Sequence, residues 1–132
     1  MSGELILIVD DNELNLKLAR LVLEAHGYQI KAAEDGFQAL KLLDEIRPRL
    51  ILLDIQLPGM DGLQATAVLK RDPATRAIPV IALTALAMKG DEERIRAAGC
   101  DGYIAKPLAY RDFLATVSAQ LAVTVSGDGA PP

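Results

Sequence analysis

The fold is decided by residues 50–54, which read Leu50-Ile51-Leu52-Leu53-Asp54. Four apolar residues in a row, without polar alternation, are typical of a strand that is covered on both faces, as in a parallel sheet. The carboxylate that follows marks the point where this strand leaves the core. Three further short runs have a similar design and are also predicted to be strands. They are Leu5-Ile6-Leu7-Ile8-Val9, Val80-Ile81-Ala82-Leu83 and Gly102-Tyr103-Ile104-Ala105.

The segments between these runs carry apolar residues at three- and four-residue spacing, which predicts amphipathic helices. Gly27 is a favourable C-terminal stop for the first helix, and Pro48 and Pro73 follow the second and the third. The residues expected to form the apolar face of the first helix are Leu14, Leu18, Leu21, Val22 and Ala25. Those of the later helices include Ala39, Leu40, Leu43, Leu63, Ala67, Ile95, Phe113 and Val117.

Five strand–helix units in about 120 residues predict one α/β domain, residues 1–122, with helices on both faces of the sheet. Strand–helix–strand crossovers are right-handed, so the strands run parallel and their carboxyl ends meet at one edge. We expect a flavodoxin-like, doubly wound, five-stranded parallel sheet of order 2-1-3-4-5 with five helices. This order puts the topological switch between strands one and three. Residues 123–132 are expected to form a flexible C-terminal tail.

Composition excludes several classes of protein. The chain has 132 residues and a net charge of −4, without the basic stripe that a nucleic-acid binder needs. Its apolar runs fall well short of the roughly 20 residues of a membrane span. Cys100 is the only cysteine, which excludes an internal disulfide and leads us to expect a cytoplasmic protein.

Carboxylates follow two of the predicted strands. Asp10 and Asp11 close the first run and Asp54 closes the third, so all three flank the expected switch point. Three carboxylates repel one another unless positive charge lies between them, and oxygen ligands without His or Cys favour Mg²⁺. We expect Asp11, Asp54 and the backbone carbonyl of Gln56 to bind Mg²⁺ directly, and Asp10 to act through water. The alternative is that Asp11 or Asn12 caps the following helix.

Asp54 and three other residues suggest phosphoryl chemistry at this edge. A carboxylate such as Asp54 can attack phosphorus and form an aspartyl phosphate. The ammonium of Lys106 can pair with carboxylates at rest and with phosphoryl oxygens after transfer. The hydroxyl of Thr84 is expected to donate to a phosphoryl oxygen, and Tyr103, on the neighbouring strand, to turn inwards as Thr84 moves. Each of these three is unremarkable alone: a surface lysine, a strand-end threonine and a core-edge tyrosine.

The sequence lacks the residues needed for a catalytic triad, a zinc site or a glycine-rich nucleotide-binding motif. His26 is the only histidine, so neither a Ser/His/Asp triad nor a zinc site can be assembled. The glycines form neither a Walker pattern nor a dinucleotide fingerprint.

At these residues the chain resembles the receiver domain of two-component response regulators, over residues 4–122. The motifs that carry the resemblance are Val9-Asp10-Asp11-Asn12, residues 53–62, Leu83-Thr84-Ala85 and Lys106-Pro107. The resemblance implies that Asp54 accepts the phosphoryl group, that Asp10 and Asp11 are the acid pair, and that Lys106 is the invariant lysine. It also makes Thr84 and Tyr103 the switch residues.

Residues 10–15 and 87–95 are further similar to single-domain cell-cycle regulators of the DivK type, and also to receiver domains of hybrid histidine kinases. The resemblance implies phosphotransfer from a histidine kinase or a histidine phosphotransfer protein, with Mg²⁺ required. It also implies a downstream effector protein on the face built from the fourth helix, fifth strand and fifth helix. An alternative reading is a receiver domain cut from a larger hybrid kinase or multidomain regulator.

Two other functions agree less well with the sequence than this signalling switch, which is expected not to be an enzyme. A phosphatase with an aspartyl nucleophile usually needs a general acid two residues beyond it, and Gln56 stands there. A binding module that has lost phosphorylation is disfavoured by the intact Asp54, Thr84 and Lys106.

Overall fold

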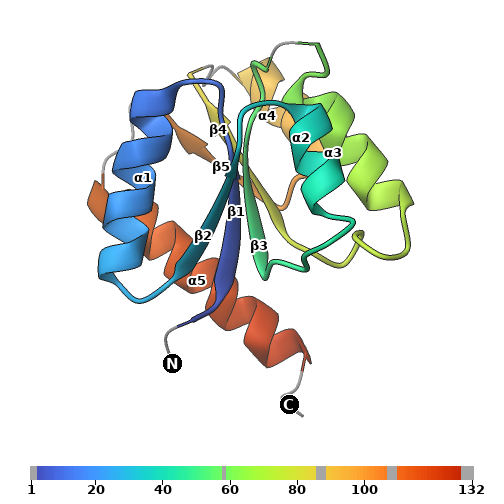
Figure 1. Ribbon diagram of the computed structural model, residues 1–132. Helices are drawn as coiled ribbons and strands as arrows, with labels where there is room; N and C mark the ends of the chain where they lie inside the picture. The colour runs from blue at the N-terminus through green and yellow to red at the C-terminus, as the bar shows by residue number, and fades with distance from the viewer. Residues whose placement is uncertain (1–2, 58, 86–88, 107–109, 129–132) are drawn as a thin grey trace.

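The computed structural model describes residues 3–57, 59–85, 89–106 and 110–128 and shows a five-stranded parallel sheet. The strand order is β2-β1-β3-β4-β5, as the sequence predicts. The strands are β1 (Leu5–Val9), β2 (Gln29–Ala33), β3 (Leu50–Asp54), β4 (Val80–Thr84) and β5 (Gly102–Ala105). Their carboxyl ends point to the same edge, away from the chain termini (Figure 1).

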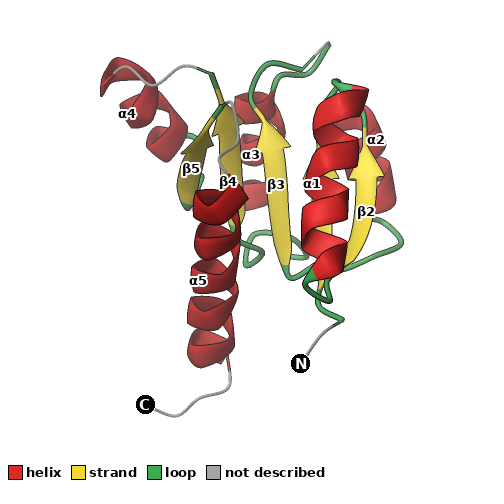
Figure 2. Cartoon of the chain, turned by 90° about the vertical axis from the view of Figure 1, so that its left-hand side faces the viewer, coloured by secondary structure: helices red, strands yellow, loops and turns green. Residues whose placement is uncertain are grey.

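Helices cover both faces of the sheet, as right-handed crossovers require. The helices are α1 (Glu13–Ala25), α2 (Gly36–Leu42), α3 (Gly62–Arg71), α4 (Lys89–Ala97) and α5 (Tyr110–Asp128). Helices α1 and α5 pack on one face and α2 and α3 on the other, and α4 lies at the β5 end of the sheet (Figure 2). No helix in the described part of the chain has the length and hydropathy that a bilayer crossing requires.

Alternate residues of each strand face opposite layers, so the sheet divides the core in two. One apolar cluster, which includes Leu7, Leu53 and Ile95, lies on the side of α2, α3 and α4. The other, which includes Ile8, Leu23 and Phe113, lies on the side of α1 and α5. Strand β3 is buried along its whole length, which explains its uninterrupted apolar sequence.

Helix α1 begins and ends where local chemistry directs. The side chain of Asn12 accepts a hydrogen bond from the backbone N–H of Asn15, so Asn12 is the N-cap and Asp11 is not. At the other end Gly27 has φ +92°, and the N–H groups of Gly27 and Tyr28 donate to the carbonyls of Glu24 and Leu23. This is a Schellman motif, and it confirms Gly27 as the helix stop.

The apolar face predicted for α1 is wrong in part. Leu14 is 62% exposed and Leu21 is 57% exposed, whereas Ala19 and Leu23 are buried in the core. Both sets have helical spacing, and the side that packs on the sheet is the one with the small Ala19, which allows a close approach of the helix.

The C-terminal helix extends past residue 122, the predicted end of the domain. Helix α5 continues to Asp128, which takes it into the segment 123–132 that we expected to be a tail. Residues 129–132 lie outside the described residues, so the flexibility of the tail stays a prediction.

Candidate functional site

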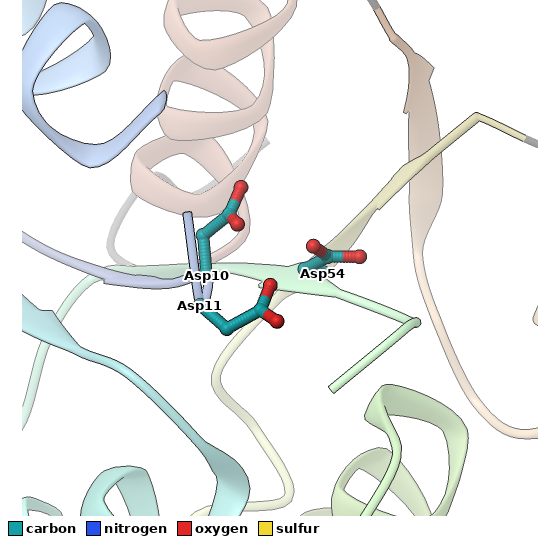
Figure 3. Close-up of side chains that lie close together, drawn as sticks. All are labelled: Asp10, Asp11 and Asp54. Atoms are coloured by element: carbon teal, nitrogen blue, oxygen red, sulfur yellow. The ribbon is translucent and has the colours of Figure 1, made fainter. Parts of the chain in front are cut away.

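Three carboxylates meet at the carboxyl edge of β1 and β3. Ligand atoms of Asp10, Asp11 and Asp54 all lie within 4.8 Å of one another. Their side chains lie close together at the two strand ends (Figure 3). Asp10 and Asp54 are 1% and 4% exposed, while Asp11 is exposed to solvent. The sequence predicts three carboxylates at the topological switch point, and the structure adds that two of them are buried and one is accessible.

Asp10 is held by groups from three parts of the chain. Its Oδ1 accepts from the backbone N–H of Asn12 at 2.9 Å, and its Oδ2 accepts from Asn15 Nδ2 at 3.4 Å. Lys106 Nζ lies 3.1 Å from the same Oδ2. Because Asn12 takes the role of helix cap, the carboxylate of Asp11 is not used in capping.

Both oxygens of Asp54 accept hydrogen bonds. Oδ1 accepts from the backbone N–H of Gln56 at 2.9 Å, and Oδ2 accepts from Lys106 Nζ at 2.8 Å. The pKa of Asp54 is nevertheless raised above its ordinary value, first because burial penalises the charged form and further because Asp10 is a second anion nearby. The hydrogen bonds from Lys106 and Gln56 oppose this shift without cancelling it.

Lys106 extends from the end of β5 towards the two buried carboxylates. Its backbone N–H donates to the carbonyl of Thr84 at 2.7 Å, which anchors the strand ends to each other. Burial would lower the pKa of its ammonium group, but hydrogen bonds to Asp54 and Asp10 outweigh burial and raise it. Lys106 is therefore a firmly protonated cation shared by two anions. Pro107, the second half of its motif, lies outside the described residues.

Thr84 and Tyr103 face the same side of the sheet. Tyr103 is the register partner of Ala82 on the adjacent strand, and Thr84 comes two residues after Ala82. Thr84 is fully buried, and Tyr103 is partly buried against the cluster on the α4 side. The hydroxyl of Tyr103 donates to Oε2 of Glu92 at 3.2 Å. The structure thus brings these two predicted switch residues to neighbouring strands, and their roles remain predictions.

The loop after Asp54 returns sharply to the strand it has just left. A Cβ on Gly62 would lie 2.3 Å from the carbonyl oxygen of Asp54 and 2.5 Å from Ile55 Cα, so only glycine fits there. Asp61 and Gln64 then form a capping box that begins α3. The side chain of Gln56 is exposed, and the part assigned to its carbonyl stays a prediction. Pro58 lies outside the described residues.

Two residues of this region were missed by sequence reasoning. Asn15 donates to Asp10 from the first turn of α1, and Glu92 accepts from Tyr103 across the gap between α4 and β5. Asn15 could have been found, because it lies three residues after the helix cap on the side of the strand ends. Nothing local marks Glu92 among its acidic neighbours.

The donor set fits a hard divalent cation. Asp10, Asp11 and Asp54 offer carboxylate oxygens only, the ligands that Mg²⁺ prefers, and the cluster has more negative charge than Lys106 can neutralise. The exposure of Asp11 leaves one side of the cluster accessible to an ion.

Comparison with known proteins gives a consistent result. The family model described as "Response regulator receiver domain" matches residues 6–118. The chain is 53% identical over 116 residues to the polar-differentiation response regulator DivK of Brucella anthropi. That alignment covers 88% of this chain and 94% of the relative.

Solved structures agree with the sequence relatives. A CheY-like response regulator receiver domain protein from Methanospirillum hungatei superposes with a TM-score of 0.88 at 28% identity, covering 96% of this chain and 99% of that one. The receiver domain of a sensor histidine kinase from Pseudomonas aeruginosa has a TM-score of 0.84 at 34% identity, with 92% and 99% covered. That structure has a magnesium ion coordinated in its active site cleft.

Proposed function

This chain belongs to the response regulator receiver domain family, and on that premise we propose that Asp54 accepts a phosphoryl group from a phosphohistidine donor in a Mg²⁺-dependent reaction. The chain is a signalling protein rather than a catalytic enzyme. The donor is a histidine kinase or a histidine phosphotransfer protein.

One observation carries the proposal. Asp54 is a buried carboxylate with Lys106 Nζ 2.8 Å from one oxygen and two further carboxylates within 4.8 Å. A structural ion pair would need one anion for each cation, whereas this site has three anions and one lysine. The excess negative charge calls for a further cation, and Mg²⁺ would supply positive charge for the carboxylates and for an incoming phosphoryl group.

The transfer step balances as a simple displacement. A carboxylate oxygen of Asp54 attacks phosphorus, and the bond between phosphorus and the imidazole nitrogen breaks. The electron pair of that bond stays with the imidazole, which takes up a proton, and Asp54 becomes an aspartyl phosphate. Lys106 then pairs with phosphoryl oxygens, and the Thr84 hydroxyl donates to one of them.

Asp11, Asp54 and the Gln56 carbonyl would hold the ion directly, and Asp10 would hold it through water. A bound Mg²⁺ would supply positive charge that offsets the negative charge of the nucleophile and of the incoming phosphoryl oxygens. The residues themselves orient the site: Asn12 and Asn15 fix Asp10, and the Gln56 N–H fixes Asp54.

The surface of α1 supports a protein as the donor. Leu14, Leu21 and Phe37 are the large apolar side chains that lie exposed in the described part of the chain, and two of the three belong to α1. Leu14 lies on the first turn of α1, beside Asp11 and Asn12. We therefore include α1 in the docking surface for the phosphohistidine protein.

In this proposal the downstream effector protein binds to the face formed by α4, β5 and α5. Phosphorylation draws Thr84 towards the site, and Tyr103 follows it. A DivK-like part in polar differentiation is proposed from the similarity to the Brucella anthropi protein. A cytoplasmic location is proposed with it, since Cys100 is a free buried thiol, as a reducing compartment permits.

The test is incubation with acetyl phosphate and Mg²⁺, followed by intact mass measurement. We expect one added phosphoryl group on the wild-type protein and none on Asp54→Asn, which should remain folded. Labelling of Asp54→Asn to the same extent would refute the assignment of the acceptor.

A further inference from the structure

Helix α4 is held to the sheet by few side chains. Among its described side chains only Ile95 is buried, at 1% exposure. The helix has nine residues, a length that is marginal without tertiary contacts. Gly90 weakens the helix further, because glycine lowers helix stability. No close neighbour requires a glycine at this position, since a Cβ there would meet nothing within 4 Å. The placement of α4 therefore depends strongly on each contact it makes.

One such contact joins Glu92 to Tyr103. The Tyr103 hydroxyl donates to Glu92 Oε2 at 3.2 Å in a partly buried position. The other oxygen of Glu92, Oε1, lies 3.5 Å from Arg96 Nη2 one turn further along α4. This second contact is exposed and weak, whereas the hydrogen bond from Tyr103 is partly buried and has a charged acceptor, which makes it stronger than a neutral one.

The switch in the proposed function gives the ring of Tyr103 a second position, towards Thr84. Its register partner Ala82 presents only a methyl group, and Thr84 is the next residue on the same face of β4. A rotamer change that brings the ring towards Thr84 moves the hydroxyl from its present position and breaks the hydrogen bond to Glu92. The hydrogen bond described here therefore belongs to one of the two positions only.

The same structure has Asp54 as a carboxylate engaged by Lys106 at 2.8 Å. We propose that Glu92 is the positioning residue that holds Tyr103 in this arrangement and thereby opposes phosphorylation of Asp54. The inference rests on the proposed function, in which phosphorylation draws Tyr103 towards Thr84. If this hydrogen bond must break when Asp54 is phosphorylated, the bond disfavours phosphorylation. By linkage, phosphorylation weakens the same contact between α4 and β5.

Four variants and one matched control test the proposal on the whole chain. Glu92→Ala removes the acceptor, Tyr103→Phe removes the donor and keeps the ring, and the double variant removes both. Glu92→Gln keeps a side-chain oxygen that can accept. Glu93→Ala is the control, because it removes the same charge from an exposed position on the same helix. The first readout is the affinity for beryllofluoride, a phosphoryl mimic, in the presence of Mg²⁺.

Glu92→Ala and Tyr103→Phe should each tighten beryllofluoride binding by about threefold to tenfold, the range that one hydrogen bond commands. The double variant should gain no more than either single variant, and Glu92→Gln and Glu93→Ala should stay near wild type. A general structural loss would weaken binding instead of tightening it. Additive effects in the double variant, or equal effects of Glu92→Ala and Glu93→Ala, would overturn the proposal.

A second readout needs neither Mg²⁺ nor a phosphoryl mimic. Amide hydrogen exchange across residues 91–98 should be faster in Glu92→Ala and Tyr103→Phe than in Glu93→Ala, because α4 has lost a tie to β5. Unchanged exchange refutes the tie even if Asp54 is phosphorylated normally. If the wild type takes up no phosphoryl group, the proposed function fails first, and faster exchange would still show that Glu92 positions Tyr103 and α4.

Discussion

The ammonium group of Lys106 lies 2.8 Å from Oδ2 of Asp54. It also lies 3.1 Å from Oδ2 of Asp10, so one positive charge serves two buried carboxylates. One cation cannot neutralise two anions, and burial together with Asp10 keeps the pKa of Asp54 raised despite the hydrogen bond from Lys106. The folded protein therefore carries an electrostatic cost at this site.

Replacing Asp54 by Asn should relieve that cost. At neutral pH without Mg²⁺ we expect Asp54→Asn to raise the free energy of unfolding by about 1 kcal/mol, as neutralising a functional site often does. The pKa of Asp54 is raised in the folded state, so the folded state binds this proton more tightly than the unfolded chain does. Protonation of Asp54 therefore stabilises the fold below the ordinary pKa of 3.8, and this stabilisation is lost as pH rises through the folded pKa. The gain of the variant should thus grow from acid to neutral pH.

Urea unfolding of wild type and Asp54→Asn at a series of pH values measures this difference. A gain that is the same at acid and neutral pH would contradict an electrostatic origin.

Mg²⁺ affinity should depend more on Asp11 than on Asp10. Asp11 is the exposed carboxylate, whereas Asp10 is buried and already accepts from Asn12, Asn15 and Lys106. We expect Asp11→Ala to weaken Mg²⁺ binding by about tenfold or more, and Asp10→Ala to weaken it less. Calorimetric titration with MgCl₂ gives both values, and the reverse order would exchange the two roles.

Gly62 should tolerate no side chain. A Cβ at this position would meet the backbone of Asp54 and Ile55 at 2.3 and 2.5 Å, distances that only a shift of the strand or of α3 could relieve. Gly62→Ala should therefore lower the free energy of unfolding by about 3 kcal/mol or more. Gly90→Ala is the matched substitution in open space and should raise it by up to about 1 kcal/mol. Thermal unfolding of the two variants compares them directly.

The parallel direction of the strands and their shared carboxyl edge were predictable, because they follow from periodicity and crossover handedness. The order 2-1-3-4-5 was expected only as one of the common orders of doubly wound sheets. The ends of three strands agree with the apolar runs 5–9, 50–53 and 80–83, which correspond to β1, β3 and β4. Strands β3 and β4 each include one further polar residue at the carboxyl end. Strand β2 was not readable as an apolar run, since it is an edge strand with exposed Gln29 and Lys31. Its existence followed only from the number of crossovers.

The buried side of α1 was not predictable from spacing. Leu14, Leu18 and Leu21 make as good a helical stripe as Leu16, Ala19 and Leu23, and only packing against the sheet selects the second. Long-range contacts such as Glu92 with Tyr103 are also invisible to periodicity. The carboxylate cluster was predictable, because residues at the carboxyl ends of parallel strands must share an edge.

The hydrogen bonds made by Lys70, here called the Lys70 clasp, lie away from the site and should affect only the stability of the protein. Lys70 Nζ donates to the carbonyls of Arg76 and Ile78 and to Asp101, whose Oδ2 also accepts from the Val80 N–H. Lys70→Met should cost about 1–3 kcal/mol of unfolding free energy, because several partners lose their donor. Arg94→Ala, which removes an exposed contact to Asp91, should cost less than about 0.5 kcal/mol. Similar losses in both would show that the clasp adds nothing.

The exposed leucines of α1 should matter for the donor protein alone. Leu14→Ser and Leu21→Ser remove apolar surface that the core does not use, so the stability of the domain should change by less than about 0.5 kcal/mol. If α1 docks the phosphohistidine protein, the double variant should slow phosphotransfer from a phosphorylated histidine phosphotransfer domain by about tenfold or more. Labelling by acetyl phosphate, which needs no docking, should be unchanged. Phe37→Ser is the control, since Phe37 is 59% exposed on α2, and equal slowing by Phe37→Ser would remove α1 from the docking surface.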